Sequence, residues 1–291
     1  MKQLTALGGA ALAIVLSGFM AASGQRGSAP APVSPPSVFI EELTWVEVRD
    51  AIKAGKTTVI MPTGGVEQSG PHMVLGKENY AMVYCAREIA KRLGNALVAP
   101  NLAYVPEGGI EPPSGHMRFA GSITLPQEPF IQVLVWAGRS FKVNGFTDVA
   151  FIGNSGGNMA GLKAAAEQLN KEWAGTGVRA HDINEYYESA AAAQGGKPYD
   201  SPFDHWLLAQ GEKPNDIGNH AGIRDTSTLM GVEAATTSRG KLVRWDKIAP
   251  AADGSGVSGN PTRASVAYGI KGLEMKIEAA VRQIKALTAK K

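Results

Sequence analysis

The stretch Met61–Asn79 reads MPTGGVEQSGPHMVLGKEN and follows a short apolar run, Thr57–Ile60, that has the composition of a buried strand. Its glycines and its proline predict a turn-rich loop. Three ionisable side chains, Glu67, His72 and Glu78, fall within twelve residues of one another on this loop. Because open α/β sheets hold their chemistry at the C-terminal ends of the strands, we expect a functional site here.

Strand-like and helix-like segments alternate along the rest of the chain. The expected strands are 57–61, 96–99, 148–152 and 178–183, and the expected helices are 42–54, 79–93, 129–143, 159–173 and 264–289. Strands separated by helices of this length are typical of parallel sheets. The pattern predicts the α/β class, as one three-layer α/β/α domain with a mostly parallel central sheet.

The N-terminal residues have a different composition from this domain. Residues 1–23 combine an early lysine, an apolar run and a cluster of small residues, which is the pattern of a secretory signal peptide. Residues 24–37 form a linker rich in proline, alanine and serine. We therefore expect residues 38–291 to form the folded domain of a periplasmic or secreted protein that is not membrane-bound after cleavage.

The composition excludes several classes of protein. With 44% apolar and 19% charged residues the chain is globular rather than disordered. A net charge of +3, with scattered basic residues, argues against a nucleic-acid partner. Cys85 is the only cysteine, so an internal disulfide is impossible, and its apolar helical surroundings predict a buried thiol.

Two further loops carry polar side chains that suit chemistry. Gly153–Asn158 directly follows the apolar run that ends at Ile152, and His220–Ser227 contains an imidazole and a carboxylate. Loops after neighbouring strands converge at one edge of a doubly wound sheet, so all three loops could share one cleft. Carboxylates and imidazoles together suit a divalent metal, and Zn²⁺ or Mn²⁺ fits such a mixed set best.

The order of these loops, together with Ser114–Ser122, resembles the creatininase (creatinine amidohydrolase) family of metal-dependent amidohydrolases. The resemblance runs from about Phe39 to the C-terminal helix. It implies the layered α/β/α fold of that family, a divalent Zn or Mn cofactor, a small-molecule substrate and a homo-oligomer, often a hexamer.

The resemblance also assigns roles to residues. It implies that Glu67, Glu78 and Asp225 are metal ligands and that His220 acts in catalysis together with Glu67. Other positions match residues that line the family's cleft: Ser69, His72, His116, Ser155, Gly156, Gly157 and Asn158.

This sequence departs from the family pattern at two metal-ligand positions. Ser69 and Ser155 stand where the family has histidines, and a neutral hydroxyl group binds Zn²⁺ poorly. The three acids that remain form an all-oxygen set suited to one hard ion, with His220 or His72 as a possible replacement nitrogen ligand. A full two-metal centre is therefore not expected. His72 and His116 fit a purely structural role equally well.

These observations predict an exported hydrolase that uses a metal to cleave a C–N bond, other than a peptide bond, in a cyclic or linear amide. A catalytically silent protein that binds a small molecule with the same fold is the alternative. A third possibility is a serine hydrolase, because Gly153–Gly157 has the G-x-S-x-G spacing of a nucleophile elbow around Ser155. That mechanism requires a base such as His220 and an acid such as Asp225 within hydrogen-bond reach.

Overall fold

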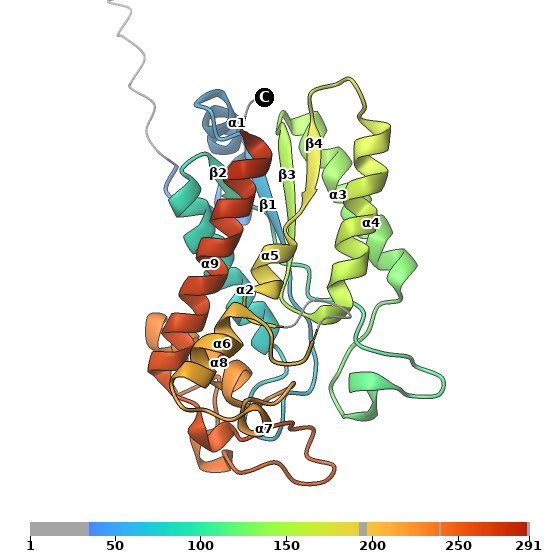
Figure 1. The fold of residues 1–291 in the computed structure, drawn as a ribbon. Coiled ribbons are helices and arrows are strands. Elements are labelled where there is room, and N and C mark those ends of the chain that lie inside the picture. Colours follow the sequence, from blue (N-terminus) through green and yellow to red (C-terminus); the bar gives the residue numbers. More distant parts are fainter. Residues whose placement is uncertain (1–34, 192–196, 239, 290–291) are drawn as a thin grey trace, which may run out of the picture. The chain divides into compact units, whose positions relative to one another are not determined.

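The computed structural model describes residues 35–191, 197–238 and 240–289 (Figure 1). Its contacts divide the chain into two units, Met1–Val33 and Ser34–Lys291, and the second unit is described here. The predicted signal peptide and residues 24–34 of the predicted linker lie outside the described residues.

A four-stranded sheet forms the centre of this unit. Its strands are β1 (Thr58–Thr63), β2 (Ala96–Val98), β3 (Asp148–Gly153) and β4 (Arg179–Asp182), in the order β2-β1-β3-β4, and every pair is parallel. β1 and β3 are buried along their whole length, which explains their nearly continuous apolar sequences. The predicted parallel α/β architecture is confirmed.

Helices cover both faces of the sheet (Figure 1). Ile60 and Ile152 pack with residues of α2 (Lys77–Leu93), α5 (Asn184–Glu188), α8 (Ile223–Ala235) and α9 (Val266–Thr288). Val59 and Phe151 point to the opposite face and pack with residues of α1 (Trp45–Lys53), α3 (Gln127–Asn144) and α4 (Met159–Glu172). The alternation of side chains along each strand thus separates two apolar layers.

Shorter helices lie between these strands and long helices along the chain. They are α6 (Pro202–Ala209), α7 (Pro214–Ile217) and the 3-10 helices η1 (Ile40–Glu42), η2 (Gly115–Arg118), η3 (Gly156–Asn158), η4 (Trp245–Lys247) and η5 (Pro261–Arg263). Cys85 is fully buried and unpaired, as its apolar surroundings predict.

One element boundary differs from the expectation in a way that matters for function. The predicted helix 79–93 begins two residues earlier, because Gly76 is the N-cap of α2 and Lys77 is its first residue. The apolar periodicity starts only after this turn, so the sequence pattern did not include it. The earlier start places Lys77 and Glu78 in the first helical turn, where both side chains are buried.

Candidate active site

A cavity of about 590 Å³ lies where the segments that follow β1 and β3 converge. Its lining includes Glu67 from the first segment, Ser155 from the second, His116 from η2 and His220 from the segment before α8. The predicted convergence of three separate loops is therefore present in the structure. The volume is in the range of pockets that bind small molecules.

Glu67 is the residue that joins the parts of this site. Its side chain is buried, with Oε2 3.1 Å from His116 Nε2 and Oε1 3.1 Å from Lys77 Nζ. The same Oε1 lies 4.0 Å from His220 Nδ1. Burial alone would raise the pKa of Glu67, but Lys77 and the two histidines lower it to about 2, so the carboxylate is ionised at neutral pH.

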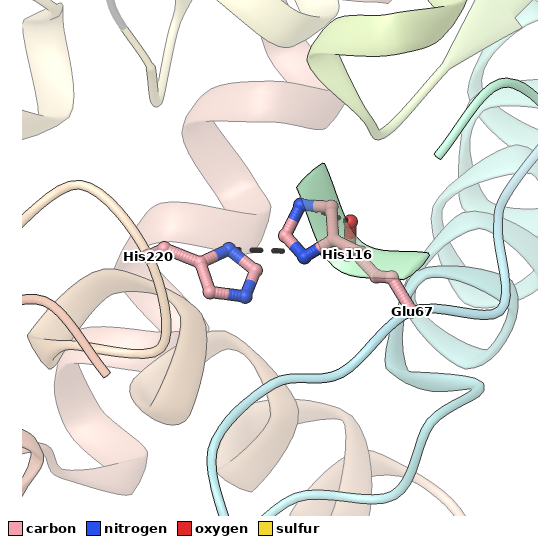
Figure 2. A group of neighbouring side chains, drawn as sticks. All are labelled: Glu67, His116 and His220. Carbon is pink, nitrogen blue, oxygen red and sulfur yellow. Dashed lines mark ion pairs between the residues drawn. The ribbon is translucent and has the colours of Figure 1, made fainter. Parts of the chain in front are cut away.

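Glu67, His116 and His220 form a group that we call the histidine cluster. Figure 2 shows the three side chains, from three separate segments, pointing toward one another. One ligand atom from each lies within 4.8 Å of the other two, which is close enough for one metal ion. The ring centroids of the two histidines are 4.6 Å apart. Burial lowers the pKa of His116, which favours the neutral imidazole that a metal requires.

The backbone fixes how His220 presents its ring. Its Nε2 lies 2.8 Å from the carbonyl oxygen of Gln68, an acceptor, so Nε2 carries the proton and Nδ1 has a free lone pair. Nδ1 is the atom that faces Glu67 and also lies 4.0 Å from Asp225 Oδ2. A histidine held through its second nitrogen in this way is typical of metal ligands.

Glu67, Glu78, Asp225 and Lys77 form a second group, the acid–lysine cluster. Lys77 Nζ contacts Glu78 Oε1 at close range and lies 3.9 Å from Asp225 Oδ2, in addition to its contact with Glu67. Burial raises the pKa of Glu78 to about 7, against the lowering effect of Lys77. Burial would raise the pKa of Asp225, but Lys77, His220 and Arg224 together hold the pKa of that carboxyl well below its usual range. All three acids that the sequence assigned to a metal therefore face one ammonium group.

Glu107 adds a fourth carboxyl group to the cavity wall. Its side chain is buried, and burial together with the nearby Glu67 carboxylate raises its pKa to about 10. Glu107 is therefore protonated at neutral pH and can donate a proton to a neighbouring acceptor. Gly65 makes room for it, because a Cβ atom there would lie 2.2 Å from Glu107 Oε1.

Only some of the residues that the sequence placed in the cleft line this cavity. Ser155, Gly156 and Gly157 line the cavity, but Ser69, His72 and Asn158 do not. His72 is fully buried, with Nε2 2.9 Å from Thr226 Oγ1. Ser69 is also fully buried, and its hydroxyl has no hydrogen-bond partner among the described residues.

Asn158 has a structural role instead. Its buried amide donates to the carbonyl oxygens of Thr63 and Gly64, so it ties the turn after β3 to the end of β1. Gly157 also has a packing role, since a Cβ atom there would lie 2.3 Å from the carbonyl oxygen of Pro106. These residues shape the loops around the cavity rather than its chemistry.

The serine-hydrolase geometry is not formed. Ser155 lines the cavity, but across the described ranges no hydrogen bond joins its hydroxyl to His220 or to another base. His220 uses Nε2 to bind the Gln68 carbonyl, and its Nδ1 faces two carboxylates. The general base that would activate Ser155 is therefore missing from its hydrogen-bond partners.

The sequence reasoning missed several side chains at the site, among them Lys77, Glu107, Asn154 and Lys276. Lys276 reaches the cavity from α9 and donates to Asn154 Oδ1 at 2.6 Å, and Asn154 in turn contacts Glu78. Lysines are usually solvated, and only the position of Lys77 next to Glu78 offered a signal. Lys276 belongs to α9, and the amphipathic pattern of that helix gave no sign that this lysine reaches a site.

A family model described as creatinine amidohydrolase, or creatininase, matches residues 41–284. The chain belongs to the creatininase family. The mycofactocin precursor peptide peptidase of Mycobacterium tuberculosis is 25% identical over 236 residues, which cover 78% of this chain and 84% of the relative. The creatinine amidohydrolase of Pseudomonas putida is 38% identical, but over only 68 residues, or 23% of this chain and 26% of the relative.

Solved structures support the same fold. A manganese form of creatininase superposes with a TM-score of 0.66 at 20% identity, covering 87% of this chain and 100% of that structure. A creatininase variant described as the Zn-Zn type gives a TM-score of 0.63 at 20% identity, covering 87% and 99%. The protein is thus a creatininase-family hydrolase whose cavity contains a candidate site for a metal ion.

Proposed function

We propose that this protein is an exported hydrolase that cleaves a C–N bond of a small amide with one divalent ion held by Glu67, His116 and His220. The observation that carries the proposal is the convergence of these three side chains at the wall of the cavity, with ligand atoms within 4.8 Å of one another. Creatininase structures described as manganese and Zn-Zn forms support Mn²⁺ or Zn²⁺ as the ion.

The two clusters differ in how well they fit a metal. The histidine cluster offers one oxygen and two nitrogen donors, the mixed set that Zn²⁺ and Mn²⁺ accept. The acid–lysine cluster does not fit, because the Lys77 ammonium lies among the three carboxylates that would have to bind the ion. We therefore derive no role for a metal at Glu78 and Asp225, the other ligands that the resemblance implied.

A bound ion would lower the pKa of a water molecule and polarise the substrate carbonyl. Side chains of the protein would then accept and donate the protons of the reaction. Asp225 is ionised, lies at the cavity wall and is the carboxylate placed to accept a proton. His220 has no free nitrogen for the leaving group once Nδ1 binds a metal, since Nε2 is held by Gln68. Glu107 is protonated at neutral pH and is the side chain that can supply that proton.

The metal content of the mature protein, purified without chelator or added metal, tests this proposal. We expect about one ion per chain by plasma mass spectrometry, lost in His116→Ala and His220→Ala. His205→Ala is the matched control, because His205 is exposed and pairs only with Asp200. A screen of cyclic and linear amides with the metal-loaded protein would then identify the substrate, with peptides included because one relative is a peptide peptidase.

One observation favours the alternative of a silent binding protein. Lys77 neutralises acids that the resemblance assigned to metal binding, so the fold and the cavity could persist without turnover. A protein without metal in all variants, inactive toward every amide, yet stabilised by one of them in thermal unfolding would establish that alternative.

A further inference from the structure

The ammonium group of Lys77 is enclosed by carboxylates. It lies 3.1 Å from Glu67 Oε1, contacts Glu78 Oε1 more closely, and is 3.9 Å from Asp225 Oδ2. Only 5% of the Lys77 surface is exposed, and Glu67 and Glu78 are similarly buried. Burial of this many charges is costly unless they compensate one another, so the ammonium and the acids form one electrostatic unit.

Helix electrostatics do not explain why a lysine occupies this position. Lys77 is the first residue of α2, where the positive end of the helix dipole disfavours a cation. The acids from three separate segments supply the strong attraction for its charge.

The second oxygen of Glu78 is also occupied. It accepts from the Asn154 amide, whose own oxygen lies 2.6 Å from the buried Lys276 ammonium. Glu78, one of the acids that the family resemblance assigns to a metal, is thus held on both sides by protein groups. The two positions at which the family has histidine ligands hold serines, and within the part of the chain that the structure describes the buried Ser69 hydroxyl has no partner.

We propose that the Lys77 ammonium replaces one cation of a two-ion centre, so that this chain binds at most one divalent ion, in the histidine cluster. The inference rests on the proposed function for that remaining ion. It follows from the enclosure of Lys77 Nζ by Glu67, Glu78 and Asp225. Unlike a metal, the ammonium offers no open coordination position, so this half of the centre contributes charge but cannot bind a water molecule or a substrate oxygen.

The same arrangement predicts an effect of removing the lysine. Lys77→Ala would remove the ammonium group from among Glu67, Glu78 and Asp225 and leave the oxygen-rich environment that Mn²⁺ accepts. Lys77→Arg is the matched control, because it keeps the positive charge at the same position. If Lys77→Ala does not fold, Lys77→Gln is the test substitution.

Metal counting by native mass spectrometry after dialysis against excess Mn²⁺ tests the inference without reference to activity. We expect one more bound ion per folded chain in Lys77→Ala than in the wild type, and no gain in Lys77→Arg. We also expect the melting temperature of Lys77→Ala to fall by roughly 10 °C in chelator and to recover in Mn²⁺.

The outcomes separate this inference from the proposed function. A wild type without metal and a variant with one ion would refute the metal part of the proposed function and support the role of Lys77. One ion in both the wild type and the variant would support the metal part of the proposed function and refute the role of Lys77. Two ions in the wild type, which electron paramagnetic resonance would detect as a coupled Mn²⁺ pair, would overturn the inference even if neither Lys77 variant folds.

Discussion

At the scale of single residues, Glu107 shows that several acids can lie close together in the cavity when one of them stays protonated. Three carboxylates share the charge of Lys77, and the fourth acid stays neutral because burial and Glu67 raise its pKa to about 10. In the unfolded chain the same side chain ionises near pH 4.3. Between these two values the folded state holds a proton that the unfolded state releases, so Glu107 reduces the free energy of unfolding as the pH rises.

Glu107→Gln should therefore stabilise the protein at pH 8 and leave it unchanged at pH 4. Glutamine has nearly the same shape, keeps a donor toward Glu67 and removes the proton that folding must retain. We expect a gain of up to about 5 kcal/mol at pH 8, measured by urea unfolding across the pH range. Glu111→Gln, an exposed change in the same loop, is the control. Equal effects of Glu107→Gln at both pH values would show that Glu107 is ionised in the folded state.

Prediction from sequence worked unevenly at this scale. Glu67, His116 and His220 were recognisable because loop motifs surround them, and they do meet at the cavity. Glu107 and Lys276 were not recognisable, because a glutamate or lysine outside a motif is normally solvated, and for Lys77 the only signal was its position next to Glu78. Their burial depends on charges brought from distant segments, and no local pattern encodes that. The roles of the acids as ligands remain a prediction.

At the scale of elements, the crossing of α8 and α9 positions two charges of the site. Asp225 lies in the first turn of α8 and α9 carries Lys276, and the two helices approach closely through glycines. A Cβ atom on Gly269 would lie 1.8 Å from the backbone oxygen of Ser227, and one on Gly231 would lie 2.8 Å from the backbone of Gly269. Neither backbone can yield without moving a helix.

Gly269→Ala should consequently destabilise the protein by about 3 kcal/mol, although helix propensity alone predicts a gain of roughly 1 kcal/mol. The cost arises because the added methyl group overlaps the Ser227 carbonyl and pushes the helices apart. Lys271→Ala, at an exposed position two residues away on α9, should change stability by less than about 0.5 kcal/mol. Denaturant unfolding measures both variants, and a stabilised Gly269→Ala would contradict the close contact between these helices.

The strands and long helices were predictable because apolar periodicity extends through them, and strand 148–152 and helix 159–173 differ from β3 and α4 by one residue at their C-terminal ends. The start of α2 was not predictable in this way. Its first turn contains Lys77 and Glu78, whose burial comes from ion pairing rather than from an apolar face. Element boundaries at the site therefore depend on tertiary electrostatics.

At the scale of the whole molecule, the sheet brings the loops after β1 and β3 together, in line with the expected convergence of loops at one edge of a parallel sheet. Export and assembly are properties that the fold does not test. No helix among the described residues is both long and apolar enough to span a membrane. We propose, from the N-terminal pattern and the family resemblance, that the mature protein is a periplasmic or secreted homo-oligomer.

The outer surface of α3 offers a place to test assembly. Val133, Trp136 and Val143 are exposed to 41%, 63% and 87%, and their spacing of three and seven residues places them along one stripe of the helix. Exposed apolar side chains that gather on one face commonly mark a protein interface. A second copy of this chain is the partner that the family resemblance implies.

Protein recovered from the periplasm of an expression host should lack about the first 23 residues, as measured by intact mass.

Light scattering of the mature protein should give several chains per particle. Trp136→Lys should shift the particle toward single chains, because it places a charge in an interface that the stripe would bury. Trp45→Lys, a change at another exposed tryptophan outside the stripe, should leave the mass unchanged. A wild-type protein that scatters as a single chain would contradict the assembly, and full-length protein retained in the cytoplasm would contradict export.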